Sequence, residues 1–235
     1  MTLLDRLDEV VYEDGKQCVI AITGGGGKTT TLIALAQYYK NRGLSVLVST
    51  TTKMQNPSHY RFEVDHVMTD EKDFFNHEVK KGESVLFVQK HIMNAKKCMA
   101  PRDEILPLIS KRFDVSIFEA DGARCLPLKK HRECDPVIPS SVTAVIAIGG
   151  MSCFNKMAAD NCMGEADMSK KVDVKYLQDL IDDEEGMLKR VNSDHKSVIL
   201  LNQCDLLRQE DLDRLRFLVA PCPILLGSVE ENTTY

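Results

Sequence analysis

The stretch Cys18-Val19-Ile20-Ala21-Ile22-Thr23-Gly24-Gly25-Gly26-Gly27-Lys28-Thr29-Thr30-Thr31 decides the fold. An apolar strand runs into four glycines, which lead into Lys28-Thr29 and a helical pattern. Glycines let successive backbone N–H groups curve around phosphate oxygens, because no Cβ atom stands in the way. The helix that follows directs its positive end at the same oxygens. This order of strand, glycines and helix predicts a site for the phosphates of a nucleotide.

The polar positions of this glycine loop match the parts of a bound nucleotide. Lys28 is placed to reach the β- and γ-phosphates, and the Thr29 hydroxyl suits a Mg²⁺ ion. We expect the phosphate-binding residues to be Gly24, Gly25, Gly26, Gly27, Lys28, Thr29 and Thr30. The full G-x-x-x-x-G-K-[ST] pattern would need glycine where this chain has Ile22, so the loop is a shorter form. It resembles the loop of Mur-type ATP-dependent ligases and other short P-loops; the alternative is a glycine-rich turn without a ligand.

Short β-branched runs alternate with helical patterns along the whole chain. The strands are apolar on both faces, which is typical of a parallel sheet covered by helices on both sides. Strands are expected at 18–23, 45–49, 66–68, 84–88, 115–119, 142–148, 197–202 and 224–226. Helices are expected at 3–11, 28–42, 103–112, 174–182 and 209–217.

The chain has 235 residues and shows no low-complexity linker and no internal repeat. We therefore predict that residues 1–235 form one α/β domain, a three-layer P-loop NTPase with a mainly parallel sheet flanked by helices. The segment 151–171 follows no helical or strand period. It is either an irregular surface excursion or a mobile loop that carries function.

A second motif lies where the predicted strand 115–119 ends in acidic residues. Glu119 and Asp121 stand two positions apart, so in a continuing strand they share a face. Ligands of parallel sheets gather at the carboxyl ends of the strands, where an acid holds Mg²⁺ or orients an attacking water. We expect Thr29 and Glu119 to hold the metal, and Lys28, Glu119 and Asp121 to be catalytic. A turn acid that caps the next segment is the alternative for Asp121.

A third motif, Asn202-Gln203-Cys204-Asp205, follows an apolar strand and resembles the N-K-x-D guanine motif of G proteins. In that motif the aspartate accepts the two N–H donors that guanine has and adenine lacks, while the asparagine braces the loop. We expect Asn202 and Asp205 to bind the nucleotide. Gln203 replaces the usual lysine, whose stem packs on the base, so both GTP and ATP remain open.

Two further polar stretches are candidates for a second substrate. Thr52 and Lys53 follow the second predicted strand, where a polar turn is the alternative explanation. Arg124 and Lys129 belong to a cationic stretch, Arg124–Arg132, that suits an anionic cofactor or is a solvated basic loop.

The composition narrows the class of protein. Thirty Lys+Arg against thirty-five Asp+Glu give a net charge of −5, which argues against a broad nucleic-acid surface. No apolar run approaches the roughly 18–20 residues that span a bilayer, and no secretory signal is visible. The eight cysteines are scattered without a Cys-x-x-Cys pair. We expect reduced thiols in a cytoplasmic protein that binds neither nucleic acid nor membrane.

Taken together, the motifs resemble the YqeC family. The resemblance spans nearly the whole chain, and its most specific part is the EADGA…PLK…DPVIP stretch. The residues that carry it are Thr23–Thr30, Thr50–Lys53, Glu119–Arg124, Pro127–Lys129, Asp135–Pro139 and Asn202–Asp205. The resemblance implies a P-loop NTPase fold and an accessory role in the maturation of a selenium-dependent molybdenum hydroxylase or its molybdenum cofactor. In the family the base motif more often carries lysine than the Gln203 found here.

The leading hypothesis is therefore an NTPase that couples the binding or slow hydrolysis of GTP or ATP, with Mg²⁺, to cofactor insertion or selenation. An ATP-dependent ligase or kinase that acts on a small molecule is one alternative. A nucleotide-gated chaperone without significant turnover is another. A molybdenum hydroxylase, its cofactor or a second copy of the chain are the partners to consider, the last by analogy with P-loop switches that close their sites across a two-fold axis.

Overall fold

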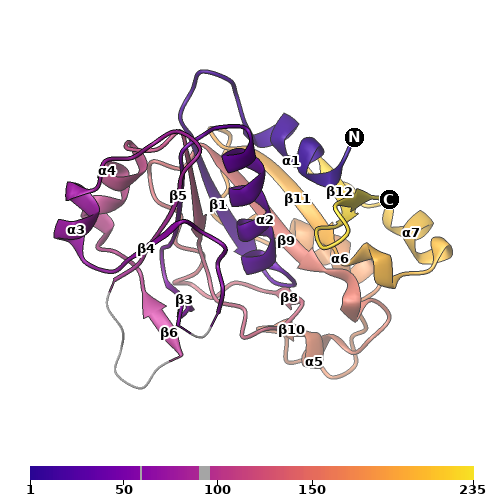
Figure 1. The fold of residues 1–235 in the computed structure, drawn as a ribbon. Helices are drawn as coiled ribbons and strands as arrows, with labels where there is room; N and C mark the ends of the chain where they lie inside the picture. The colour runs from indigo at the N-terminus through magenta and orange to yellow at the C-terminus, as the bar shows by residue number, and fades with distance from the viewer. Residues whose placement is uncertain (59, 90–95) are drawn as a thin grey trace.

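The computed structural model describes residues 1–58, 60–89 and 96–235, shown in Figure 1. The main sheet is built from β1 Cys18–Gly24, β2 Val46–Thr50, β4 His66–Met68, β5 Ser84–Phe87, β7 Val115–Glu119, β9 Ala144–Gly150, β11 Lys196–Asn202, β12 Ile224–Ser228 and β13 Thr233–Thr234. These nine strands lie in the order β13-β12-β11-β9-β1-β7-β2-β5-β4. Neighbours run parallel except β12 and β13, which run antiparallel.

Two small sheets lie apart from the main one. They are the antiparallel pair of β3 Lys53–Gln55 with β6 Lys97–Met99, and the parallel pair of β8 Leu128–Lys129 with β10 Cys162–Met163. In Figure 1 both pairs lie below the main sheet. Each comes shortly after the carboxyl end of a main strand, so both pairs border the edge at which the glycine loop lies.

The helices are α1 Leu3–Val11, α2 Lys28–Asn41, α3 Glu71–Asn76, α4 Leu106–Ser110, α5 Ala158–Asn161, α6 Val174–Asp182 and α7 Gln209–Leu215. Short 3₁₀ helices occupy Asp103–Ile105, Met151–Cys153 and Cys204–Leu206. No helix in the described ranges is both long enough and apolar enough to cross a membrane.

Side chains that alternate along the strands divide the core into two layers. Ile20 and Ile22 of β1 face α1 and α2, in a cluster with Leu7 and Leu35. Their neighbours on β1 point to the other face, into the cluster that contains residues of α3 and α4. On that same face, a further cluster packs α6 and α7 against β11 and β12. The sheet is therefore covered on both sides, and the predicted three-layer, mainly parallel α/β architecture is confirmed.

The predicted elements differ from the observed ones where local chemistry intervenes. The helix expected over 103–112 is instead a 3₁₀ turn followed by the short α4. Pro107 lacks the N–H that a continuous helix needs, which explains the break. The strand expected at 142–148 begins at Ala144 and continues to Gly150. The segment 151–171 is partly packed, with Cys153, Phe154 and Ala158 buried.

All eight cysteines are free thiols, as expected. Five of them are buried, namely Cys18, Cys98, Cys153, Cys162 and Cys204. Cys125 and Cys134 are exposed. The buried thiols therefore pack as small apolar side chains in the core.

Candidate functional site

The glycine loop joins the central strand β1 to α2. Gly24, Gly26 and Gly27 adopt positive φ angles of 92°, 75° and 121°, which side chains on an L-residue disfavour. A Cβ atom on Gly26 would lie 2.3 Å from the Cα atom of Gly150, and one on Gly25 would lie 2.5 Å from the carbonyl oxygen of Leu126. Glycine is therefore required both by the backbone conformation and by the close packing of the loop against β9 and the segment that precedes β8.

The backbone N–H groups of the loop fall into two sets. The N–H of Gly24 donates to Asp121 Oδ2 at 3.0 Å, and that of Gly25 donates to the Ile148 carbonyl at 2.9 Å. The next five N–H groups have no acceptor within the described ranges; they belong to Gly26, Gly27, Lys28, Thr29 and Thr30. They occupy the amino end of α2, where orphan N–H groups and the helix dipole favour an anion.

Lys28 is folded back into the protein. Its Nζ atom donates to the Gly24 carbonyl at 2.6 Å and lies 3.1 Å from Asp121 Oδ1. The Lys28 side chain is only 6% exposed, and that of Asp121 is fully buried. Asp121 therefore fixes both the end of β1, through the Gly24 N–H, and the ammonium group of the loop lysine.

Two more basic side chains enclose Asp121. Lys129 Nζ lies 3.2 Å from Asp121 Oδ2 and 3.1 Å from Asp135 Oδ2. His131 Nε2 lies 2.7 Å from Asp121 Oδ2, while its Nδ1 lies 2.7 Å from the Gly186 carbonyl oxygen. Both His131 nitrogens thus lie within hydrogen-bond distance of an oxygen atom, so the ring is held at both ends. Asp121 is the centre of a buried network that we call the Asp121 network, made of Lys28, Asp121, Lys129, His131 and Asp135.

The electrostatics of Asp121 follow from this enclosure. Burial alone would raise the pKa of its carboxyl group. The hydrogen bond from His131 and the charges of Lys28 and Lys129 outweigh burial, so the pKa of Asp121 lies well below its ordinary value. Asp121 is therefore a carboxylate whose charge balances the cations around it.

Glu119 has the opposite electrostatic character. Burial raises the pKa of Glu119, and the charge of Lys28 and the Thr29 hydrogen bond only partly offset this effect. The Thr29 hydroxyl donates to Glu119 Oε2 at 3.0 Å. Mg²⁺–oxygen distances of about 2.1 Å place neighbouring octahedral ligands about 3 Å apart, so these two oxygens fit adjacent Mg²⁺ ligands. A buried carboxylate of this kind gains from a nearby cation.

The end of β11 reaches the same loop through Asn202. Its Nδ2 donates to the Gly26 carbonyl at 2.9 Å, and its Oδ1 accepts from the Val229 N–H at 2.9 Å. Gln203 follows in a left-handed conformation with a φ of 65°. Asp205 is exposed in the next 3₁₀ turn and does not line the cavity described below. Asn202, at the end of β11, thus links the glycine loop to the residue that follows β12.

A cavity of about 320 Å³ opens beside the loop. Its floor contains the loop from Gly26 to Thr30 together with Glu119. Its walls come from the β3–β6 strand pair, the segment 122–127, Ser152 and Gln203. Three basic residues on these walls form no ion pair within the described parts of the chain, and we call them the cavity cations: Lys53, Lys97 and Arg124.

The four residues expected at a second substrate are therefore separated in space. Lys53 and Arg124 line the cavity. Lys129 does not line it, because Asp121 and Asp135 hold this side chain in the interior. Thr52 also lies outside the lining, and the hydroxyls of Thr50 and Thr51 before it donate to backbone carbonyls.

Local sequence patterns predict neither the position of Lys97 at the cavity nor the contact of His131 with Asp121. Lys97 reaches the cavity because β6 pairs with β3, a contact between segments 42 residues apart that no local pattern announces. His131 belongs to the basic stretch Arg124–Arg132, in which the sequence pattern does not distinguish one residue from another. Its spacing of ten residues from Asp121 gives no signal of the contact.

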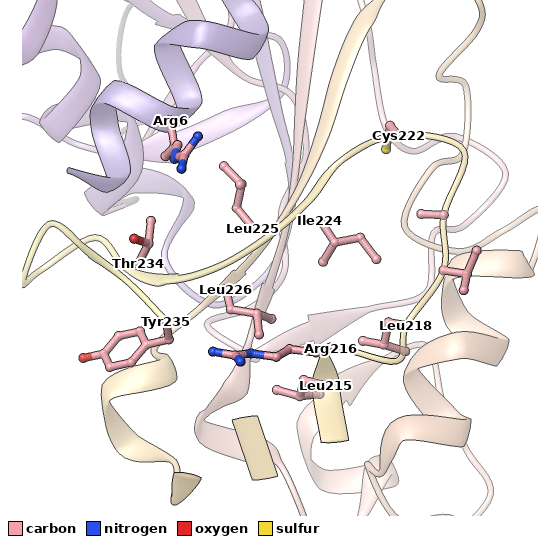
Figure 2. Close-up of a pocket in the computed structure, with 12 residues that line it drawn as sticks. Arg6, Leu215, Arg216, Leu218, Cys222, Ile224, Leu225, Leu226, Thr234 and Tyr235 are labelled. Atoms are coloured by element: carbon pink, nitrogen blue, oxygen red, sulfur yellow. The ribbon is translucent and has the colours of Figure 1, made fainter. Parts of the chain in front are cut away.

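A different cavity of about 560 Å³ lies between β12 and α7, shown in Figure 2. Mainly aliphatic side chains line it, including Leu215, Ile224 and Leu226, with Arg6, Arg216 and Tyr235 at its margin. No carboxylate side chain lines it within the described residues. Its lining therefore differs from that of the cavity beside the glycine loop, which includes the carboxylate of Glu119.

Comparison with known proteins gives three findings. The family described as YqeC protein matches residues 20–165. "Uncharacterized protein YqeC" of Escherichia coli (strain K12) is 35% identical over 153 residues, which are 61% of this chain and 56% of that protein. The matched region thus spans little more than half the length of this relative. FtsY from Mycoplasma mycoides is similar in structure, with a TM-score of 0.48 and 15% identity over 94% of this chain and 64% of that chain.

Proposed function

The chain belongs to the YqeC family, and we propose that it binds a nucleoside triphosphate together with Mg²⁺ at the glycine loop. The observation that carries this proposal is the set of N–H groups from Gly26 to Thr30 that have no acceptor among the described residues, located at the amino end of α2 beside a cavity. Such an array binds phosphate oxygens without rearrangement of the backbone.

The residues around the array have distinct proposed roles. Thr29 and Glu119 would hold Mg²⁺, which supplies charge neutralisation at the phosphates when it is bound. Lys28 would turn from Asp121 to the β- and γ-phosphates, and Lys129 would keep Asp121 neutralised. Asp121 then acts as a positioning residue for the loop and for Lys28, while Glu119 is the acid closest to the reacting phosphate.

The nucleotide base is proposed to lie toward Asn202–Asp205. Asn202 braces the loop, and Gln203 lines the cavity with a side-chain oxygen that has no hydrogen-bond donor within the described ranges. Asp205 is exposed and free to accept the paired donors of guanine. We therefore propose that GTP is preferred over ATP, with Asp205 as the discriminating residue.

The biological role proposed is maturation of a selenium-dependent molybdenum hydroxylase or its cofactor. The resemblance to the YqeC family supports this role. The cavity cations are compatible with this role, because Lys53, Lys97 and Arg124 suit a second anionic ligand, such as the cofactor, beside the nucleotide. The same observation supports a second candidate, an enzyme that transfers a phosphoryl group to an anionic small molecule.

Calorimetric titration with Mg·GTP and Mg·ATP tests the binding site. Lys28→Met should weaken nucleotide binding about 10- to 100-fold, because a charged hydrogen-bond donor to the phosphates is lost. The matched control is Lys40→Met, at the other end of the same helix, where the lysine pairs with Asp65. Unchanged affinity in Lys28→Met would remove the loop from the site.

Base preference and turnover need separate measurements. Asp205→Asn should weaken GTP binding far more than ATP binding; an equal loss for both nucleotides argues against guanine recognition. Phosphate release with and without molybdenum cofactor distinguishes an NTPase from a gated binding protein. If a small anion stimulates nucleoside diphosphate formation and is itself modified, the transfer enzyme is the correct function.

A further inference from the structure

A cluster of metal-ligand type lies far from the glycine loop along the strands. His66 begins the edge strand β4, His77 caps the end of α3, and Glu83 directly precedes β5. Since β4 and β5 run parallel to β1, their first residues lie at the amino edge of the sheet, opposite the glycine loop. Figure 1 shows α3, β4 and β5 together at one side of the molecule. The cluster is therefore separate from the proposed nucleotide site.

The three side chains converge on one point. One ligand atom from each lies within 4.8 Å of the other two. His66 Nε2 is 3.8 Å from Glu83 Oε1, and His77 Nε2 contacts the same oxygen directly. The two imidazole rings have centroids 5.0 Å apart and are tilted by 56°, so they are not stacked face to face. Both rings instead direct a nitrogen at the carboxylate.

Glu83 is unusual among the acids of this chain. It is 7% exposed, and its ion-pair partners within the described ranges are the two histidines rather than lysine or arginine. Its second oxygen accepts the Lys80 N–H at 3.1 Å, which orients the carboxylate toward the rings. A buried carboxylate fixed by a backbone donor and facing two imidazoles is the arrangement that metal sites use to hold an acidic ligand.

The backbone that carries His77 is also fixed. The His77 N–H donates to the Asp73 carbonyl at 3.1 Å, and Arg112 donates to the His77 carbonyl. Only His66, with a side chain 48% exposed, borders solvent freely. His77 and Glu83 are thus held in place by the backbone around them, and His66 on the edge strand β4 supplies the third ligand.

We propose that His66, His77 and Glu83 form a zinc-binding site. Two histidines and one glutamate are a donor set typical of Zn²⁺, with a fourth position open to water. In tetrahedral geometry, ligand atoms at about 2.1 Å from zinc lie about 3.4 Å from one another. His77 and Glu83, which are in direct contact, must separate to reach this spacing, and His66 must approach Glu83 from 3.8 Å. The ion would join β4, α3 and β5 at the edge of the sheet.

Cobalt titration of the chelator-treated, reduced full-length protein tests the site. Co²⁺ replaces Zn²⁺ and reports its ligands by visible absorption bands, and thiolate ligands add near-ultraviolet charge-transfer bands. We expect one equivalent of Co²⁺ to bind without thiolate bands and to be displaced by Zn²⁺. Zn²⁺ should also raise the Tm of the wild-type protein, because the assembled site of the folded state binds the ion more tightly than the unfolded chain does.

Three variants decide whether these residues are the ligands. His66→Ala and Glu83→Gln should each lower Zn²⁺ affinity by more than about 10-fold, since each removes one of three ligands. His66 is half-exposed, so its variant keeps the proposal testable even if Glu83→Gln fails to fold. His195→Ala, at a histidine outside the cluster, should bind Zn²⁺ like the wild type. Equal affinity in His66→Ala and wild type, or strong thiolate bands, would overturn the proposal.

Discussion

Two sets of basic side chains lie at the carboxyl edge of the sheet. One set is buried and paired with a carboxylate, and the other lines an open cavity. In the Asp121 network, Lys28, Lys129 and His131 are buried against one carboxylate. The cavity cations Lys53, Lys97 and Arg124 face open space with no acidic partner within the described ranges. The first set is balanced inside the protein, whereas the second leaves positive charge for an incoming anion.

The two sets are therefore expected to affect different properties, the first the stability of the fold and the second the binding of ligands. Charges in the Asp121 network are desolvated, so removal of one partner leaves a buried charge uncompensated. The cavity cations keep their hydration, so they contribute little to stability and act on ligands instead. Lys28 belongs to the buried set in this structure and would join the ligand-binding set when a nucleotide arrives.

The largest expected effect comes from the centre of the buried set. Asp121→Ala should reduce the free energy of unfolding by about 3–5 kcal/mol, because Lys28 and His131 lose their carboxylate and Gly24 loses an acceptor. Urea denaturation followed by circular dichroism measures this change. The exposed Asp205→Ala variant should change stability by no more than about 0.5 kcal/mol. Similar values for both variants would contradict the division into two sets.

The brace between the loop and β11 should have an intermediate effect. Asn202→Ala removes the hydrogen bonds to the Gly26 carbonyl and the Val229 N–H, which should cost about 1–3 kcal/mol of stability. Asn41→Ala, exposed at the last residue of α2, is the control, and denaturation midpoints give the comparison. A loss of nucleotide affinity in Asn202→Ala without a loss of stability would mean that Asn202 contacts the ligand rather than the loop.

The cavity cations should show the reverse pattern. Single Lys53→Ala, Lys97→Ala and Arg124→Ala variants should each change stability by less than about 0.5 kcal/mol. Each should weaken binding of an anionic ligand by about 2- to 5-fold, with a smaller salt dependence than wild type. Titrations at low and high salt test this prediction. Destabilisation comparable to Asp121→Ala would place these residues in the buried set.

A smaller effect concerns the pH dependence of stability, to which Glu119 and Asp121 contribute in opposite directions. The lowered pKa of Asp121 stabilises the fold above the ordinary carboxyl value of about 3.9, and this contribution is lost as pH falls through the lowered pKa. The raised pKa of Glu119 acts in the other direction, because stability falls as pH rises through that pKa. Glu119→Gln should therefore gain stability relative to wild type as pH rises toward neutrality. Parallel pH profiles for the two proteins would refute this assignment.

The sequence allowed good prediction of the elements whose patterns are local. The glycine stretch, the apolar strands and the long helix α2 follow from short-range periodicity, and all lie close to their expected bounds. The β3–β6 pair and the β8–β10 pair were not predicted, because their strands have two or three residues each and pair over long sequence distances.

The sequence motifs of the candidate site were predictable, but the contacts that their side chains make with one another were not. Arg124 and Lys129 lie five positions apart and read as one basic patch, yet Arg124 lines the cavity while Lys129 pairs with Asp121 and Asp135. Burial decides this division, since β8 carries Lys129 into the interior. Sequence spacing alone carries no information about which side of the backbone is enclosed.

Amide hydrogen exchange at residues 26–29 tests the central claim most directly. Their N–H groups have no acceptor within the described ranges, so phosphate oxygens should supply one. With saturating Mg·GTP or Mg·ATP, these amides should become protected, while those around the apolar cavity at Leu226 and Tyr235 should exchange as before. Unchanged exchange at residues 26–29 with nucleotide bound, or protection confined to the apolar cavity, would contradict the account.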